Sequence, residues 1–209
     1  MGDGPKKDRS AATPLETRGR LIVLSGPSGA GKSSILHRLT ARPGFRPSIS
    51  ATTRPRRKGE RDGVDYTFVD RESFERLVAE GQFIEHALVH GNHYGTLVSH
   101  VRDILDEGAV CVLDIDVQGA RALRDQGLDS VFVFVAPPSL EELERRLRTR
   151  GTDDEAAIAR RLVRAREELE EKGMYDLCVE NDVLDRAVDE VVDYLEERGV
   201  TPHPGKDRP

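Results

Sequence analysis

The stretch from Gly26 to Ser33, GPSGAGKS, has residue types and spacing suited to holding phosphate groups. It matches the pattern G-x-x-x-x-G-K-[ST], in which glycines allow a tight turn whose backbone N–H groups converge on phosphate oxygens. Lys32 supplies a cation for the β- and γ-phosphates, and the hydroxyl of Ser33 is a ligand for Mg²⁺. The stretch therefore predicts a binding loop for a nucleoside triphosphate, with Mg²⁺ as its cofactor.

Two aspartates end an apolar run further along the chain, VCVLDID. Asp114 and Asp116 stand at the carboxyl end of a predicted strand, which is where ligands bind in open α/β sheets. Acidic residues also close strands at ordinary surface turns. The phosphate loop upstream favours the first interpretation, and we expect Asp114 to share the metal with Ser33.

A basic cluster interrupts an otherwise acidic chain. Arg54, Arg56, Arg57, Lys58 and Arg61 lie close together in a protein whose net charge is −6 and whose pI is about 5.6. Such a cluster is typical of a solvated loop, of a nucleic-acid patch or of a pocket for a small anion. The acidic balance and the acids between the arginines argue against a general nucleic-acid binder, whose whole face would be basic. We expect a pocket for a small anion, with Arg56, Lys58 and Arg61 as surface charges.

The loop alone leaves the acceptor of the phosphoryl group open, because phosphate loops occur in hydrolases, switches and kinases. Two arginine-bearing segments, residues 50–95 and 145–168, favour a kinase that closes over two substrates. An acceptor that is itself a phosphate has a second pKa of about 6 and needs no strong general base. This agrees with a sequence in which no obvious base stands out. Arg54 and Arg57 would hold such an acceptor through forked hydrogen bonds.

The periodicity of apolar residues indicates the elements that position these groups. Short, wholly apolar runs bounded by turn signals are typical of strands buried on both faces of a parallel sheet. Segments with helical spacing follow these runs, and Ser139 is the expected N-cap of one of them. We expect strands over residues 20–26, 109–116, 130–137 and 176–181, and a closing helix over 184–198.

This alternation of strand and helix predicts an α/β fold, namely a P-loop NTPase-type parallel sheet flanked by helices. Two excursions leave it: an inserted acceptor-binding region, which is turn-rich and holds one helix near residues 71–81, and an arginine-rich helical lid. The expected division is a disordered leader over 1–19, a core over 20–50, 97–144 and 165–200, the inserted region over 51–96, the lid over 145–164 and a disordered tail over 201–209.

Composition places the 209-residue chain among soluble globular proteins, with 37% hydrophobic and 33% charged residues. No apolar run approaches the length of about 20 residues that spans a membrane, and the N-terminus lacks the apolar core of a secretory signal. The two cysteines, Cys111 and Cys178, lie in apolar runs, so we expect two buried thiols in a reducing compartment. The predicted location is the cytoplasm.

The motifs together resemble those of the guanylate kinase family. The resemblance covers about residues 20–198 and lies in SGPSGAGKSS, SISATTRPRRKGERDGVDYTFV, FIEHALVHGNHYGT, VCVLDIDVQGA, FVFVAPPS, RLRTRGTD and VEND. It implies an enzyme of purine nucleotide metabolism that transfers the γ-phosphoryl group of ATP to GMP, and to dGMP, giving ADP and GDP. Departures from the family pattern are small: His86 replaces a common aromatic residue, and Thr96 replaces a common serine but keeps the hydroxyl.

The resemblance also implies roles for the residues that match it. The catalytic residues would be Lys32, Arg54, Arg145, Arg150 and Arg161, of which the last three belong, with Arg146, to the lid over the ATP phosphates. ATP would bind to Gly26, Pro27, Ser28, Gly29, Ala30, Gly31, Lys32, Ser33, Ser34 and Asn181. In the GMP site, Arg54, Arg57, Tyr66 and Tyr94 would hold the phosphate, and Ser50, Glu85, Thr96 and Asp116 would take or flank the guanine.

Chemistry supports this division of the acceptor site. Guanine presents an acceptor at O6 beside donors at N1 and N2, so a carboxylate paired with a hydroxyl complements it. Adenine would leave these groups mismatched, and unpaired buried polar groups make discrimination large.

Two other functions are less consistent with the sequence. A scaffold module that resembles the family but binds phosphorylated peptides would have lost its phosphate loop, whereas Lys32, Ser33 and Asp114 are all present. A kinase acting on a phosphorylated sugar would not call for the pair of Glu85 and Ser50. The expected partners are the small molecules ATP and GMP, without nucleic acid or membrane, and the expected assembly is a monomer or a small homo-oligomer.

Overall fold

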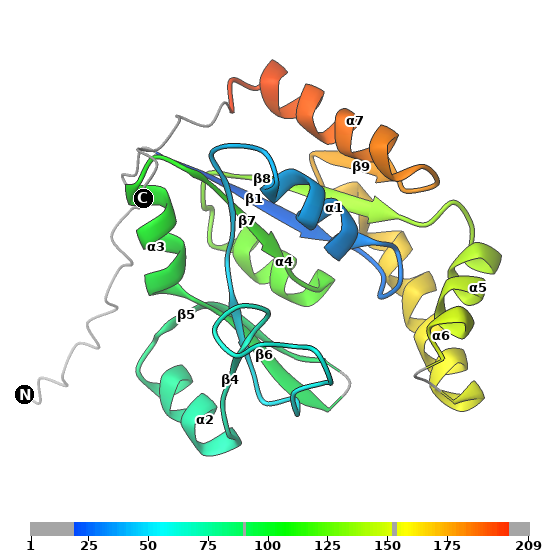
Figure 1. Ribbon diagram of the computed structural model, residues 1–209, viewed down its shortest axis with the longest axis horizontal. Helices are drawn as coiled ribbons and strands as arrows, with labels where there is room; N and C mark the ends of the chain where they lie inside the picture. Colours follow the sequence, from blue (N-terminus) through cyan, green and yellow to red (C-terminus); the bar gives the residue numbers. More distant parts are fainter. Residues whose placement is uncertain (1–18, 90, 152–153, 201–209) are drawn as a thin grey trace, which may run out of the picture.

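A parallel sheet of five strands lies at the centre of the computed structural model (Figure 1). The structure describes residues 19–89, 91–151 and 154–200. The strand order of this sheet is β2-β7-β1-β8-β9, and every neighbouring pair is parallel. The predicted parallel α/β sheet is therefore confirmed. The leader and tail predicted for the two ends lie outside the described residues, except for Gly19. The strands are β1 (Arg20–Ser25), β2 (Phe45–Pro47), β7 (Val110–Asp114), β8 (Ser130–Ala136) and β9 (Leu177–Glu180).

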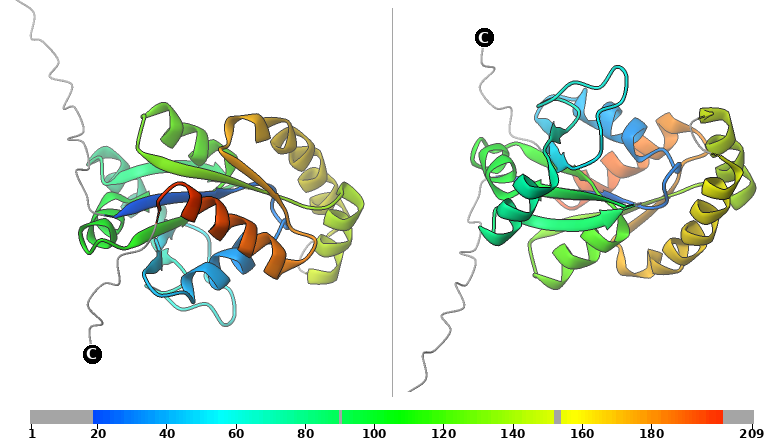
Figure 2. Two further views of the ribbon diagram at one scale, coloured as in Figure 1. Left: turned by 90° about the horizontal axis from the view of Figure 1, so that it is seen from above. Right: turned by 90° about the horizontal axis from the view of Figure 1, so that it is seen from below.

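Helices cover both faces of this sheet, which explains why its strands are apolar throughout (Figure 2). Successive strand residues point to opposite faces, so Ile22 packs with α1 and α7 whereas Val23 packs with α3 and α4. Because α1 begins within the phosphate loop, at Lys32, its packing on the sheet fixes that loop in place. The covering helices are α1 (Lys32–Thr40), α3 (Val98–Asp106), α4 (Val117–Asp125) and α7 (Leu184–Glu197).

A second, four-stranded sheet with the order β4-β3-β6-β5 occupies the region predicted only as a turn-rich excursion. The β3–β6 and β5–β6 pairs are antiparallel. The single helix expected there is present as α2, which Asp70 caps by accepting a hydrogen bond from the Ser73 N–H and which stacks Phe74 on Phe83 at 4.5 Å. The elements are β3 (Ser50–Thr52), β4 (Thr67–Phe68), α2 (Arg71–Ala79), β5 (Phe83–Val89) and β6 (Asn92–Leu97).

A pair of helices, α5 (Leu140–Arg150) and α6 (Glu155–Glu170), lies at the opposite end of the molecule from α2 (Figure 1). The Ser139 side chain accepts a hydrogen bond from the Glu142 N–H at the start of α5, so the predicted N-cap is confirmed. The pair has its own apolar cluster, made of Leu143, Leu147, Ile158 and Ala165. This cluster extends past both ends of the predicted lid, 145–164. A 3₁₀ turn, Glu171–Met174, leads from α6 to β9.

The two cysteines differ in exposure. Cys111 is buried in β7, whereas Cys178 is exposed on β9, so the prediction of two buried thiols was wrong for Cys178. The reason is the position of β9, which has a neighbour, β8, on one side only and forms the edge of the sheet. Within the described residues, each helix is too short or too polar to cross a membrane.

Candidate active site

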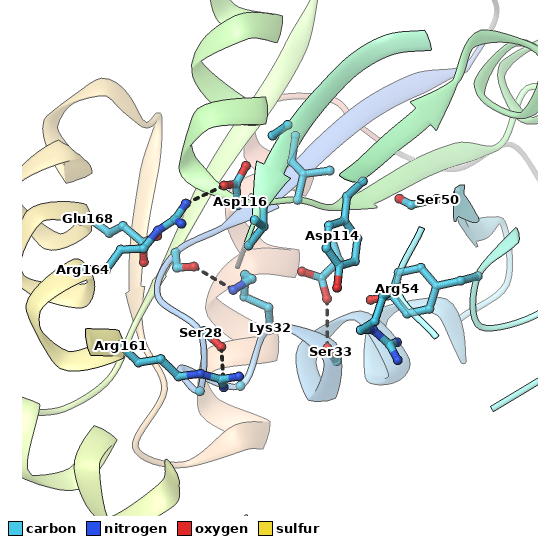
Figure 3. Close-up of a pocket in the computed structure, with 18 of the residues that line it drawn as sticks. Ser28, Lys32, Ser33, Ser50, Arg54, Asp114, Asp116, Arg161, Arg164 and Glu168 are labelled. Atoms are coloured by element: carbon cyan, nitrogen blue, oxygen red, sulfur yellow. Dashed lines mark hydrogen bonds and ion pairs between the residues drawn. The ribbon is translucent and has the colours of Figure 1, made fainter. Parts of the chain in front are cut away.

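A cavity of about 580 Å³ lies where the carboxyl ends of β1 and β7 meet the second sheet and α6 (Figure 3). Ligands of open α/β sheets bind at this edge. Its walls bring together segments that are far apart in the sequence. The lining residues are Gly26, Ser28, Gly29, Gly31, Lys32, Ser33, Ser34, Ser50, Arg54, Arg57, Glu60, Tyr66, Glu85, Ala87, Val89, Tyr94, Asp114, Ile115, Asp116, Arg161, Arg164 and Glu168.

The phosphate loop connects β1 to α1 and depends on glycine at two positions. Gly26 has φ 134° and Gly31 has φ 97°, in a region that residues with a Cβ rarely adopt. A Cβ on Gly31 would also lie 2.1 Å from Nδ2 of Asn181. Lys32 Nζ donates hydrogen bonds to the carbonyls of Gly26 (2.7 Å) and Pro27 (3.1 Å), so its ammonium group lies folded over the loop. The loop thus presents backbone N–H groups, a helix N-terminus and a cation to one small space.

The two expected metal ligands are adjacent. Ser33, in the first turn of α1, donates a hydrogen bond of 2.9 Å to Oδ2 of Asp114 at the end of β7. Among the described residues, no group of three or more His, Cys, Asp or Glu side chains forms a metal cage. A hydroxyl beside a single carboxylate suits Mg²⁺, which keeps several waters and uses one or two carboxylates together with substrate phosphates.

The basic cluster supplies one deeply placed arginine. Arg54 forms a two-pronged ion pair with Glu60, with Nη2–Oε1 at 2.7 Å and Nη1–Oε2 at 3.1 Å. Both side chains are largely buried, and the guanidinium also lies over the Tyr66 ring, 5.3 Å from its centroid. Oε2 of Glu60 accepts a further hydrogen bond from the Arg57 N–H at 2.7 Å. The hydrogen bonds between the two side chains raise the pKa of Arg54 and lower that of Glu60. Glu60 therefore holds Arg54 and the Arg57 backbone in one arrangement.

A buried carboxylate, that of Glu85, belongs to the part of the cavity wall that the second sheet forms. Strand register places Glu85 of β5 and Ser50 of β3 opposite Thr96 of β6. Glu85 is only 6% exposed, and its Oε1 accepts a hydrogen bond of 2.6 Å from the Thr96 hydroxyl. Burial, opposed by the bond from Thr96 and reinforced by the charge of Asp116, raises the pKa of Glu85 to about 7. A Cβ on Gly119 would lie 2.4 Å from Oε2 of Glu85, so glycine at position 119 makes room for the Glu85 carboxylate.

Asp116 lies beside Glu85 and is held from three directions. Its Oδ1 accepts a hydrogen bond from the Gly119 N–H, which caps α4, at 2.9 Å. Its Oδ2 accepts hydrogen bonds from Gln118 (2.8 Å) and from Arg164 of α6 (2.9 Å). Arg164 in turn donates through Nε to Glu168 at 2.9 Å. Burial raises the pKa of Glu168.

The arginines expected over the ATP phosphates lie in different places. Arg161 donates to the Ser28 hydroxyl at 3.4 Å and lines the cavity. Arg145 is not among the residues that line the cavity; it is 69% exposed and pairs with Glu142. Its neighbour Arg146 turns inward instead and donates to the carbonyls of Ala30 (3.3 Å) and Asn181 (2.8 Å). The side chain of Arg150 lies outside the described part of the chain.

Comparison with known proteins assigns the family. The guanylate kinase family model matches residues 18–198. The chain belongs to the guanylate kinase family. It is 51% identical over 177 residues to the guanylate kinase of Syntrophotalea carbinolica, covering 84% of each chain, and 49% identical over 179 residues to that of Symbiobacterium thermophilum, covering 85% of each. The crystal structure of guanylate kinase from Anaplasma phagocytophilum is similar with a TM-score of 0.73 and 35% identity, covering 88% of each chain.

The guanylate kinase reaction transfers the γ-phosphoryl group of ATP to GMP, and the cavity brings together most of the residues expected for it. Of the expected ATP-binding residues, Asn181 lies behind the loop and donates to the Ala30 carbonyl at 2.8 Å. Thr96 is not among the lining residues, but its hydroxyl donates a hydrogen bond to Glu85, which lines the cavity. Sequence reasoning did not single out Glu60, Arg164 and Glu168, which also line the cavity. For Arg164 and Glu168 the available signal was their spacing from Arg161 on one helical face.

Proposed function

We propose that this guanylate kinase binds ATP on the phosphate loop and GMP on the second sheet, with the two phosphate chains meeting between Lys32 and Arg54. The observation that carries this proposal is that the loop, the Arg54–Glu60 pair and the buried Glu85 all face one cavity. In the donor half, Lys32 and the backbone N–H groups of the loop would hold the β- and γ-phosphates. Arg161 would contact the same phosphates, since it already donates a hydrogen bond to Ser28 of the loop.

In the acceptor half, the guanine would lie against Glu85. The carboxylate would accept hydrogen bonds from N1–H and the N2 amino group, with Thr96 fixing its orientation. The Ser50 hydroxyl forms no side-chain hydrogen bond with other described residues, which leaves it available to donate to O6. Arg54, Arg57 and the phenols of Tyr66 and Tyr94 would hold the phosphate. The contacts named here involve only base and phosphate, so dGMP would serve as an acceptor too.

The transfer itself asks for little covalent work from the protein. The acceptor oxygen is anionic near neutral pH because the second pKa of a phosphate monoester is about 6. What the site must supply is alignment and cancellation of negative charge. Lys32, Arg54 and Arg161 provide that charge from three sides. Ser33 and Asp114 would hold Mg²⁺, which neutralises charge on the donor phosphates when bound.

The wider assignments follow from the substrates. ATP and GMP are both present in the cytoplasm, which agrees with the predicted location. A monomer or a small homo-oligomer is still the predicted assembly. Arg145 and Arg150 are still predicted to belong to the lid.

An assay of ADP release with a panel of nucleoside monophosphates tests this proposal. With ATP and Mg²⁺ we expect rapid turnover of GMP, slower or equal turnover of dGMP, and negligible turnover of AMP, CMP and UMP. Chelation of the metal should abolish the reaction. A purified protein that forms no GDP under these conditions would contradict the proposal.

Glu60 provides a specific test of the phosphate clamp. Replacing it by alanine removes the partner that orients the Arg54 guanidinium and the Arg57 backbone. We expect the KM for GMP to rise about tenfold, the effect of losing about one charge-assisted hydrogen bond, with the KM for ATP unchanged. Steady-state kinetics would measure both constants.

The matched control for Glu60 is Glu80→Ala, at an exposed position after α2. It should leave both KM values unchanged. If Glu60 instead acts as a competitor that occupies Arg54 until GMP arrives, its removal will lower the KM for GMP. That result would refute the positioning role.

A further inference from the structure

One face of α6 reaches both halves of the cavity. Arg161, Arg164 and Glu168 have the spacing i, i+3 and i+7, which places them on the same side of a helix. Arg161 contacts Ser28 in the donor half, and Arg164 contacts Asp116 in the acceptor half (Figure 3). The helix therefore lies as a bridge between the phosphate loop and the guanine side of the pocket.

The ion pair between Arg164 and Asp116 is sheltered and geometrically defined. The side chains of Arg164, Asp116 and Glu168 are 28%, 17% and 12% exposed, so water screens their charges less than those of surface pairs. Nη2 of Arg164 binds Asp116 while Nε binds Glu168, each at 2.9 Å. A guanidinium held by two carboxylates on different sides is fixed in direction.

Asp116 retains capacity to bind a ligand. A carboxylate has about four acceptor positions, and Gly119, Gln118 and Arg164 occupy three of them. Its side chain still lines the cavity. The three bonds thus fix which way the remaining acceptor position points.

We propose that Arg164 is a positioning residue for GMP, which orients the Asp116 carboxylate toward the guanine and connects α6 to the acceptor half of the site. The proposal rests on the proposed function, because it takes Asp116 to flank the base. Arg164 touches no reacting atom. Its removal should therefore weaken GMP binding more than it slows the chemical step.

A second consequence concerns coupling between the substrates. ATP bound between Arg161 and the phosphate loop would hold α6 close to the loop and so favour the contact between Arg164 and Asp116. GMP would then bind more tightly in the presence of the donor nucleotide. By linkage, GMP must tighten donor binding by the same factor.

The first experiment compares three variants of the full-length protein with the wild type. Arg164→Gln removes the fork, Arg164→Lys keeps the charge but cannot bind both carboxylates in the same way, and Arg166→Gln is a matched control at an exposed position two residues further along α6. For Arg164→Gln we expect the KM for GMP to rise about tenfold, as for one charge-assisted hydrogen bond. The kcat should stay within about twofold, and the KM for ATP at saturating GMP should rise only by the factor of coupling that is lost. Arg164→Lys should recover part of the loss, and Arg166→Gln should behave as wild type.

The second experiment asks whether Arg164 acts through Asp116. In a cycle with Asp116→Asn, the double variant should be little worse than Asp116→Asn alone, since contacting residues are not additive. Calorimetric titration of GMP, with and without a non-hydrolysable ATP analogue, should show tighter GMP binding with the analogue in the wild type, and this gain should be lost in Arg164→Gln.

Three results would overturn the proposal: an unchanged KM for GMP in Arg164→Gln, with or without a lowered melting temperature, full multiplication of the two effects in the cycle, or an equal loss in Arg166→Gln. These failures are distinct from failure of the proposed function, which would appear as absence of GDP formation by the wild type.

Discussion

Replacing Lys32 by alanine is expected to abolish nearly all turnover while leaving GMP binding intact. The ammonium group lies over the loop on the Gly26 and Pro27 carbonyls, and in the proposed function it is one of two cations of the donor half, beside Arg161. Without Lys32, the negative charge on the transferring phosphoryl group would lose one of the three cations that balance it. Loss of one group that stabilises charge in the transition state costs about a hundredfold to a thousandfold in kcat. Measurement of kcat by coupled ADP release, and of GMP binding by calorimetry, would test both parts.

The control for this substitution is Lys172→Ala, which removes an exposed lysine of the 3₁₀ turn after α6. It should leave kcat unchanged. Retention of turnover within a few-fold in Lys32→Ala would refute the assignment of the loop to the donor. Loss of GMP affinity together with turnover would instead place the lysine between the two nucleotides.

The main sheet could be predicted from the sequence because its strands are buried on both faces. A run such as RLIVLSG is apolar throughout, as is typical of a strand buried on both faces. The glycine-rich turn and the helical spacing after it indicate the helix that follows. Aspartates at the end of β7 were expected near the loop for the same topological reason. The hydrogen bond between Ser33 and Asp114 agrees with that expectation.

The second sheet could not be predicted in the same way, since its strands are short and carry polar residues. Its functional result depends on register: Ser50 and Glu85 both lie opposite Thr96 although 35 positions separate them in the sequence. Pairing over such distances is set by tertiary packing, which local periodicity does not record. The resemblance named these residues, but the sequence did not show why they meet.

The lid arginines show a second limit. Arg145 and Arg146 are neighbours in a charged helix, and one residue of a helix corresponds to a rotation of about 100°. The packing of Leu143 and Leu147 against α6 fixes the rotation of α5 and so which arginine faces the loop. The structure turns Arg146 inward, onto Ala30 and Asn181, and leaves Arg145 in solvent.

Glu85→Gln is expected to reduce kcat/KM for GMP by about a hundredfold or more, because sites that read a base by hydrogen bonds discriminate strongly once a partner is mismatched. The amide has one acceptor atom where the carboxylate has two, and its NH₂ group would face a guanine donor. The Thr96 hydroxyl can still pair with the amide oxygen, so the fold should survive. The KM for ATP should not change. Glu80→Gln, at an exposed position, is the matched control.

The pH dependence of GMP use gives an independent test of Glu85. Burial raises its pKa to about 7, so the carboxyl group becomes protonated as the pH falls through neutrality and loses an acceptor for guanine. The KM for GMP at saturating ATP should therefore rise on acidification, by about tenfold one unit below the pKa. Stability has the opposite sign: a carboxyl group with a raised folded-state pKa favours the folded state at low pH, and this contribution is lost as the pH rises through about 7.

The phosphate of GMP also titrates, near pH 6, and the Glu85→Gln variant separates the two groups. It keeps the titration of the phosphate but lacks that of the side chain. The steep rise of the KM between about pH 8 and 6 should be present in the wild type and absent in the variant. Parallel profiles in the two proteins would assign the titration to the nucleotide and would remove Glu85 from guanine recognition.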